Sequence, residues 1–126
     1  MYDNVKPEDW GKLNAGIAYP LTYAVAIGDV YGRGKAIPAG TDDAPVSLDD
    51  YKTPGCYYCP NSTVAATITN IAEGGSGFKV VVENTVTSAA VTQTFYKAGR
   101  SDYFFKRSFY NGSWTSWYKY TGTEVT

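Results

Sequence analysis

Two cysteines three residues apart, Cys56 and Cys59, are the first residues in this sequence whose type and spacing suggest chemistry. A thioredoxin-like pair needs its first thiol at a helix N-terminus, which lowers the thiol pKa. Here the intervening tyrosines favour a strand, in which residues i and i+3 lie roughly 10 Å apart, too far for a disulfide. A zinc site needs further Cys or His ligands, and the chain has none. We therefore expect two reduced structural thiols and no metal.

Histidine is absent from the whole chain, which removes the most common general base and the usual serine and cysteine triads. Asp42–Asp43 and Asp49–Asp50 suit surface acids or a helix cap better than a calcium site, which needs more oxygen ligands. Polysaccharide hydrolysis needs two well-placed carboxylates. The later acidic residues are few: Glu73, Glu83, Asp102 and Glu124. The sequence thus lacks the residues of the easiest enzymatic chemistries, and we expect no catalytic residues and no cofactor.

Composition limits the classes of partner that the chain is expected to bind. The formal net charge is −1, which gives no general attraction to nucleic acid. The most apolar stretch, "GIAYPLTYAVAIG", is about 13 residues long, too short to span a bilayer. Aromatic residues make up 16% of the chain and include 12 tyrosines, which suits β-sheets and surfaces that meet polar ligands.

The chain divides at about residue 46. Residues 1–46 scatter Gly, Pro and Ala among short apolar runs, and we expect an irregular linker or neighbouring segment there. Residues 47–126 are expected to form one all-β domain, a mainly antiparallel sheet in a small sandwich or barrel-like knob with little helix. "SLDDY" favours one short helix with Ser47 as its N-cap. The expected strands are 55–59, 64–69, 78–83, 90–97, 102–109 and 114–120.

Asn111–Gly112 is the strongest local signal in the sequence. Asn and Gly tolerate the positive φ of a type I′ turn, so they predict a two-residue hairpin. The turn places Phe109 opposite Trp114 and, when the pairing is continued, Lys106 opposite Trp117. Cross-strand partners share a face of the sheet, and successive residues alternate between faces.

This register separates the two tryptophans. The more aromatic face must be buried, and we expect its core to be Tyr103, Phe105, Phe109, Trp114 and Tyr118. The other face mixes aromatic, basic and hydroxyl side chains, and we expect any ligand site there: Lys106, Ser108, Tyr110, Thr115, Trp117 and Lys119. A pyranose ring would stack on Trp117 while lysines and hydroxyls hold its polar groups. Two alternatives stay open, namely that cation–π contacts of Trp117 only stabilise the sheet surface, or that it anchors an interface.

Four segments together carry a family resemblance: "DDYKTPGCYYCP", "ITNIAEGGSGFKVVVEN", "VTQTFY" and "SFYNGSWTSWYKY". In their order and spacing, from about Leu48 to Tyr120, they resemble the pyocin-knob domain of tail fibres of bacteriophages and phage-tail-like bacteriocins. Family members usually carry aliphatic or polar residues where Cys56 and Cys59 stand, so the cysteines look incidental.

The resemblance implies a non-enzymatic β module on a homotrimeric fibre, located in a virion tail fibre or an extracellular tailocin particle. Its expected partner is a bacterial cell-surface glycan, with no nucleic acid and no membrane, and the module would serve host attachment or build the fibre tip. Residues 1–46 would then be shaft or linker. The alternatives are a carbohydrate-binding module of a secreted enzyme and, less favoured, a tailspike enzyme that degrades polysaccharide.

Overall fold

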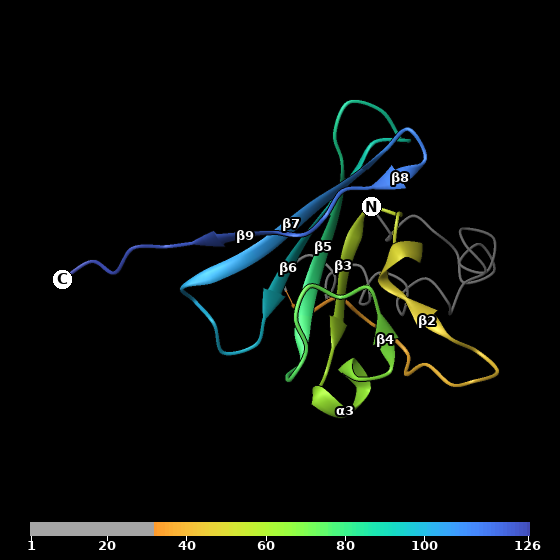
Figure 1. Cartoon of the computed structure of the whole chain (residues 1–126), viewed down its shortest axis with the longest axis horizontal. Helices are drawn as coiled ribbons and strands as arrows, with labels where there is room; N and C mark the ends of the chain where they lie inside the picture. The colour runs from red at the N-terminus through yellow and green to blue at the C-terminus, as the bar shows by residue number, and fades with distance from the viewer. Residues whose placement is uncertain (1–31) are drawn as a thin grey trace, which may run out of the picture.

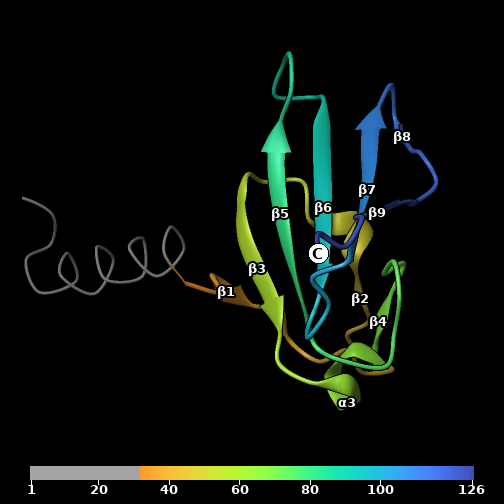
Figure 2. The ribbon, with the colours of Figure 1, turned by 90° about the vertical axis from the view of Figure 1, so that its left-hand side faces the viewer.

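The computed structural model describes residues 32–126; residues 1–31 of the predicted N-terminal segment lie outside the described part. The fold has two layers (Figure 1 and Figure 2). The larger layer is a seven-stranded sheet, with strands β1 (Lys35–Ala36), β3 (Gly55–Cys59), β5 (Phe78–Asn84), β6 (Val91–Lys97), β7 (Tyr103–Tyr110), β8 (Ser113–Trp114) and β9 (Tyr118–Thr121). The smaller layer is a parallel pair of short strands, β2 (Val46–Ser47) and β4 (Ile68–Thr69).

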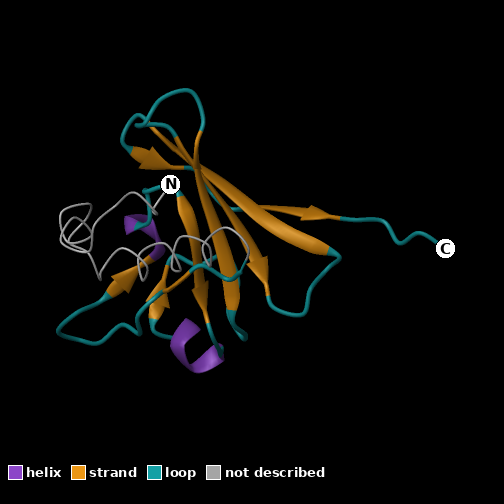
Figure 3. Cartoon of the chain, turned by 180° about the vertical axis from the view of Figure 1, so that it is seen from behind, coloured by secondary structure: helices purple, strands orange, loops and turns teal. Residues whose placement is uncertain are grey.

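The large sheet is an antiparallel meander of β3, β5, β6 and β7, extended at both edges. At one edge β1 runs parallel to β3, and at the other β8 and β9 both pair with β7. Within residues 32–126 the helices are the 3-10 helix η2 (Leu48–Asp50) and the single-turn helix α3 (Ser62–Ala65), seen from behind in Figure 3. The predicted all-β class with little helix is confirmed. No helix in the described part is long and apolar enough to cross a membrane.

The core lies between the two layers, so the large sheet has an inner face toward β2 and β4 and an outer face away from them. On β5 the alternation is clean: Phe78, Val80 and Val82 point inward and are buried, while Glu83 points outward and is exposed. Residues from both layers form one cluster of buried side chains: Ile37, Leu48, Cys59, Ala65, Ile68, Phe78, Val80, Val82, Val91, Phe95 and Phe105.

The predicted strands 55–59, 78–83, 90–97 and 102–109 are present within a residue of their expected bounds. The predicted capping of a short helix is also confirmed, because the Ser47 hydroxyl accepts a hydrogen bond from the Asp49 amide at 3.1 Å. The predicted strand 64–69 is wrong over most of its length. Asn61 caps α3 by accepting the Val64 amide at 2.9 Å, and this cap outweighs the strand preference of the Val–Ala–Thr run that follows.

The fold also takes in residues before 47. Ile37 is buried, and its amide donates to the Tyr58 carbonyl at 2.8 Å. Gly34 allows this close approach, because a β-carbon there would lie 2.1 Å from the Cys56 carbonyl oxygen and because its φ is +82°. Residues 35–37, within the segment predicted to be irregular, therefore lie along β3 at the edge of the large sheet.

The hairpin turn at Asn111–Gly112 is confirmed, with φ of 53° and 84°. Phe109 pairs with Trp114 as predicted. The Asn–Gly pair therefore sets both the turn and the first part of the pairing.

Beyond Thr115 the register slips by one residue. The Thr115 amide still donates to the Ser108 carbonyl at 2.8 Å, yet Lys106 pairs with Tyr118 and not with Trp117. One extra residue is thus accommodated between β8 and β9, which is a β-bulge. Because a one-residue slip moves every later side chain to the opposite face, the predicted faces are wrong from Trp117 onward.

Candidate ligand-binding face

The residues predicted to form the hairpin core lie mainly on the inner face. Phe105 is buried in the core, and Tyr103, Phe109 and Trp114 are half-buried and pack against it. Tyr118 is 60% exposed, because the bulge turns it to the outer face beside Lys106. Its assignment to the core is therefore wrong.

Both tryptophans belong to the inner face, where they enclose Arg107. The guanidinium carbon lies 4.0 Å from the centre of the Trp114 ring and 4.5 Å from that of Trp117. Trp117 also packs edge-on against Phe95, and its indole nitrogen donates to the Asn70 carbonyl at 3.2 Å. The prediction that the tryptophans have separate roles is wrong, because the bulge returns Trp117 to the side of Trp114.

Arg107 is held by a buried polar network. Its Nε donates to Gln93 at 2.9 Å and its Nη1 to Asp49 at 2.8 Å. The Gln93 side chain donates in turn to the carbonyls of Leu48 and Tyr51, both at 2.8 Å. Burial lowers the pKa of Arg107, and the Asp49 carboxylate opposes that shift. These hydrogen bonds anchor η2 to the middle of the sheet, so the role of the network is structural.

Nη2 of Arg107 is buried without a hydrogen-bond acceptor in the described part of the chain. The two indole rings on either side supply π electrons in place of an acceptor. The same enclosure seals the guanidinium from solvent, since the side chain is only 4% exposed. Arg107 is thus out of reach of a ligand.

The six residues predicted as a ligand site do not share one face. Lys106, Ser108 and Tyr110 lie exposed on the outer face of β7. Trp117 and Lys119 face inward, and the Lys119 ammonium lies 4.0 Å from the centre of the Tyr103 ring. Thr115 is exposed, and its hydroxyl oxygen accepts the Ser108 amide at 3.0 Å. The predicted platform around Trp117 is therefore divided by the bulge.

The outer face carries an aromatic row that the sequence pattern did not predict. Cross-strand pairing places Tyr58 beside Lys79, Lys79 beside Tyr96, and Phe104 beside Tyr120. Tyr96 and Phe104 complete the line with ring centres 5.9 Å apart. We call these five side chains the aromatic row. It crosses strands β3, β5, β6, β7 and β9, a span of about 19 Å at the usual strand spacing.

The row is open to solvent at several points. Tyr96 is 41% exposed and Tyr120 48%. Tyr120 stacks on Phe104 with an interplanar angle of 14° and ring centres 5.1 Å apart, which leaves the other side of its ring available. Two hollows lie along the row, one of about 360 Å³ next to Tyr58 and Tyr96 and one of about 170 Å³ next to Phe104 and Tyr120. Flat exposed rings beside hollows suit stacking by a sugar ring.

Cations lie at one end of the row. The Arg33 guanidinium carbon is 4.3 Å from the centre of the Tyr58 ring, and the Lys79 ammonium is 5.7 Å from that of Tyr96. Within residues 32–126 neither cation forms a salt bridge. Among the described strands the outer face adds Lys106, which is exposed, against one exposed acid, Glu83. This part of the face is therefore basic although the whole chain is not.

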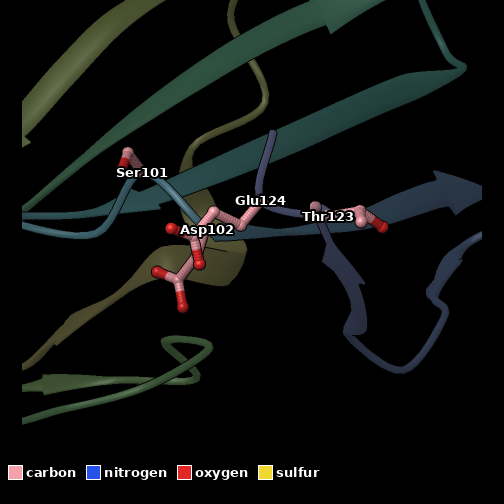
Figure 4. Close-up of a pocket in the computed structure, with 5 residues that line it drawn as sticks. Ser101, Asp102, Thr123 and Glu124 are labelled. Carbon is pink, nitrogen blue, oxygen red and sulfur yellow. The ribbon is translucent and has the colours of Figure 1, made fainter. Parts of the chain in front are cut away.

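Carboxylates lie at the other end. Asp102 and Glu124 both line a further hollow, which lies between the β6–β7 turn and the C-terminal segment (Figure 4). Asp102 is held by Arg100 through two hydrogen bonds of 3.0 and 2.7 Å, and this contact lowers the pKa of Asp102. Glu73 accepts hydrogen bonds from Lys97 and Tyr103, which hold its pKa below the ordinary value. Both Asp102 and Glu73 are therefore kept ionised by surface partners.

The two thiols lie on opposite faces of β3. Cys59 is buried in the core, and Cys56 is half-buried on the outer face; both are free. Burial raises the pKa of the Cys59 thiol, the opposite of what a reactive thiolate requires. In the described residues no group of three or more Cys, Asp or Glu side chains is arranged to hold a metal ion.

The fold resembles that of a solved tail fibre. The structure of an N-truncated R2-type pyocin tail fibre matches with a TM-score of 0.59 and 20% sequence identity, over 71% of this chain and 33% of the fibre chain. This chain therefore spans about a third of the length of that fibre chain. The pyocin-knob resemblance is confirmed at the level of the fold. The sequence matches no family model and no curated protein.

Proposed function

We propose that this chain is a non-enzymatic module of a phage or phage-tail-like tail fibre and that it contributes to attachment to glycans of the bacterial cell surface. The observation that carries the proposal is the fold shared with the R2-type pyocin tail fibre. A fold alone does not define an activity, so the glycan part of the proposal depends on the aromatic row. An open line of aromatic rings with cations beside it offers what saccharides need, namely flat apolar surfaces and hydrogen-bond donors.

The arrangement of the carboxylates supports a binding role over hydrolysis. A glycosidase needs one carboxyl group that donates a proton and a second that acts as base or nucleophile. A proton donor needs a raised pKa, whereas the partners of Glu73 and Asp102 lower theirs. Neither carboxyl group therefore has the raised pKa that a general acid requires.

We further propose that the module works as a homotrimer in the fibre, at the surface of a virion or tailocin particle. Light scattering coupled to size-exclusion chromatography tests this assembly with the full chain. A trimer supports the fibre context. A stable monomer that binds glycan would instead favour a carbohydrate-binding module of a secreted enzyme.

Binding to an array of bacterial surface polysaccharides and core oligosaccharides tests the attachment role. We expect the full chain to bind a subset of these glycans. Tyr96→Ala and Tyr120→Ala should each weaken that binding by about tenfold, the effect of removing a contact at the centre of an interface. Tyr110→Ala is the matched control, because Tyr110 is also an exposed tyrosine, at 57% against 41% for Tyr96 and 48% for Tyr120, but lies beside the turn and away from the row. Absence of binding to every glycan, or equal losses in all three variants, would contradict the proposal.

A further inference from the structure

We propose that the outer face binds an acidic saccharide that runs across the strands, with its anionic group at the Arg33–Lys79 end of the aromatic row. This inference rests on the proposed attachment function and adds the chemistry and direction of the ligand. The anionic group is a carboxylate or a phosphate, since both offer the oxygen acceptors that Arg and Lys bind.

The first support is the composition of the larger hollow. Arg33 and Lys79 line it together with Tyr58 and Tyr96, and none of its lining residues is acidic. Lys97 also lines it but is engaged by Glu73 at 2.6 Å. Within residues 32–126 Arg33 and Lys79 lie against aromatic rings and form no salt bridge, so their charges are available to a ligand. An anion here would gain two charge-assisted contacts without displacing a protein carboxylate.

The second support is the difference in charge between the two ends of the aromatic row. The opposite end of the row borders the hollow lined by Asp102 and Glu124. Asp102 is paired with Arg100 there, whereas Glu124 forms no salt bridge within residues 32–126, so the Glu124 carboxylate disfavours an anionic group and accepts hydrogen bonds from hydroxyls. A saccharide with one acidic end is therefore held in a single direction, because the reversed orientation would bring like charges together.

The third support is the spacing of the rings. The row crosses five successive strands, four of which contribute a ring and one of which contributes Lys79, so the open surface extends across the sheet and not along one strand. Its span of about 19 Å exceeds a single sugar and fits a short oligosaccharide. The exposed ring of Tyr120 would stack a neutral sugar while the hollow at Lys79 takes the acidic one.

The test measures affinities of the full chain for paired oligosaccharides that differ only in charge. The first pair is an oligogalacturonate and the same oligosaccharide with methyl-esterified carboxylates. The second is a phosphorylated core oligosaccharide of lipopolysaccharide and its dephosphorylated form. The variants are Arg33→Gln and Lys79→Gln, with Lys79→Arg as the charge-conserving control. Lys52→Gln removes the same charge elsewhere, where Lys52 lies 4.3 Å from the centre of the Phe109 ring on the inner face.

We expect at least one acidic member to bind about tenfold more tightly than its neutral partner, with an advantage that shrinks as salt increases. Arg33→Gln and Lys79→Gln should each remove most of that advantage, while Lys79→Arg and Lys52→Gln retain it. The pair that responds identifies the anion as carboxylate or phosphate.

Three outcomes would overturn the inference. Equal affinity for acidic and neutral members, still lost in Tyr120→Ala, rejects the charge assignment but leaves glycan attachment intact. Absence of binding to every saccharide removes the attachment function as well. Concentration-dependent self-association that Tyr96→Ala and Tyr120→Ala abolish would show that a second copy of the chain occupies the face.

Discussion

The two faces of the large sheet combine the same residue types for opposite purposes. On the inner face Arg107 lies between two tryptophan rings, with Gln93 and Asp49 as hydrogen-bond partners. On the outer face Arg33 and Lys79 lie beside tyrosine rings without a salt-bridge partner in residues 32–126. A cation next to an aromatic ring therefore does not by itself indicate a binding site.

Burial and hydrogen-bond partners make the difference. A buried cation that donates hydrogen bonds to protein side chains stabilises the fold, because removing it leaves those partners unpaired. An exposed cation with open donors contributes little to folding but is available to a ligand. Variants on the two faces should therefore separate stability from binding.

The largest effect on stability is expected for Arg107→Ala. The substitution leaves a cavity between the tryptophans and unpairs Gln93 and Asp49, and should cost about 3–5 kcal/mol in the free energy of unfolding. Arg100→Ala is the matched control, because Arg100 also forms a salt bridge but its side chain is 46% exposed, so its loss should lower the free energy of unfolding far less. Urea denaturation of both variants measures the difference, and similar losses would reject the structural role of Arg107.

The next largest effects are expected for Trp117→Ala and Trp114→Ala, which should each lower the free energy of unfolding by about 3 kcal/mol. Each side chain is half-buried against the core and covers one side of Arg107. The uninterrupted hairpin register would instead make Trp117→Ala distinctly milder. Parallel denaturation curves therefore decide between the bulged and the uninterrupted register.

A smaller effect on stability is expected when the pH is lowered. Because its folded-state pKa is lowered, Glu73 contributes stability that is complete above its unfolded pKa of about 4.3 and is lost as the pH falls through the lower folded value. Glu73→Gln should therefore be less stable than the original chain at pH 7 and should converge with it in acid. Unfolding free energies measured from pH 7 down to pH 2 test this, and a constant gap would exclude the carboxylate as the cause.

The smallest effect on stability is expected for Tyr120→Ala. Tyr120 is half exposed on the edge strand β9, so its loss should cost less than about 1 kcal/mol while weakening saccharide binding. Thermal unfolding and glycan affinity measured on one preparation give both values. A large loss of stability would place Tyr120 among the structural residues.

Much of the large sheet follows from local sequence rules. Alternating Val and Phe residues define β5, and Asn111–Gly112 define the hairpin turn, because both signals depend only on near neighbours. The bulge after Thr115 does not follow from those rules. The bulge places Trp117 as well as Trp114 against Arg107, a packing arrangement that strand alternation does not reveal.

The position of the candidate site does not follow from local sequence rules either. The hairpin register alone assigned Trp117 to the ligand face, whereas the aromatic row requires knowledge of how β3, β5, β6 and β9 are ordered. Tyr58 and Tyr120 are 62 positions apart in the numbering, yet both belong to this row. The available signal was the excess of tyrosine over other aromatics, which indicated a polar-ligand surface but not its position.

The most direct test of the account follows both faces during one titration. An acidic oligosaccharide is added to the isotope-labelled full chain, and NMR signals are recorded for the Trp114 and Trp117 indole N–H groups and for the amides of Lys79, Tyr96 and Tyr120. If the outer face binds the saccharide, the three outer-face amides should show saturable shifts while the indole signals stay nearly unchanged. Shifts at the Trp117 indole with unchanged outer-face amides would contradict it and return the ligand site to the inner side of the final hairpin.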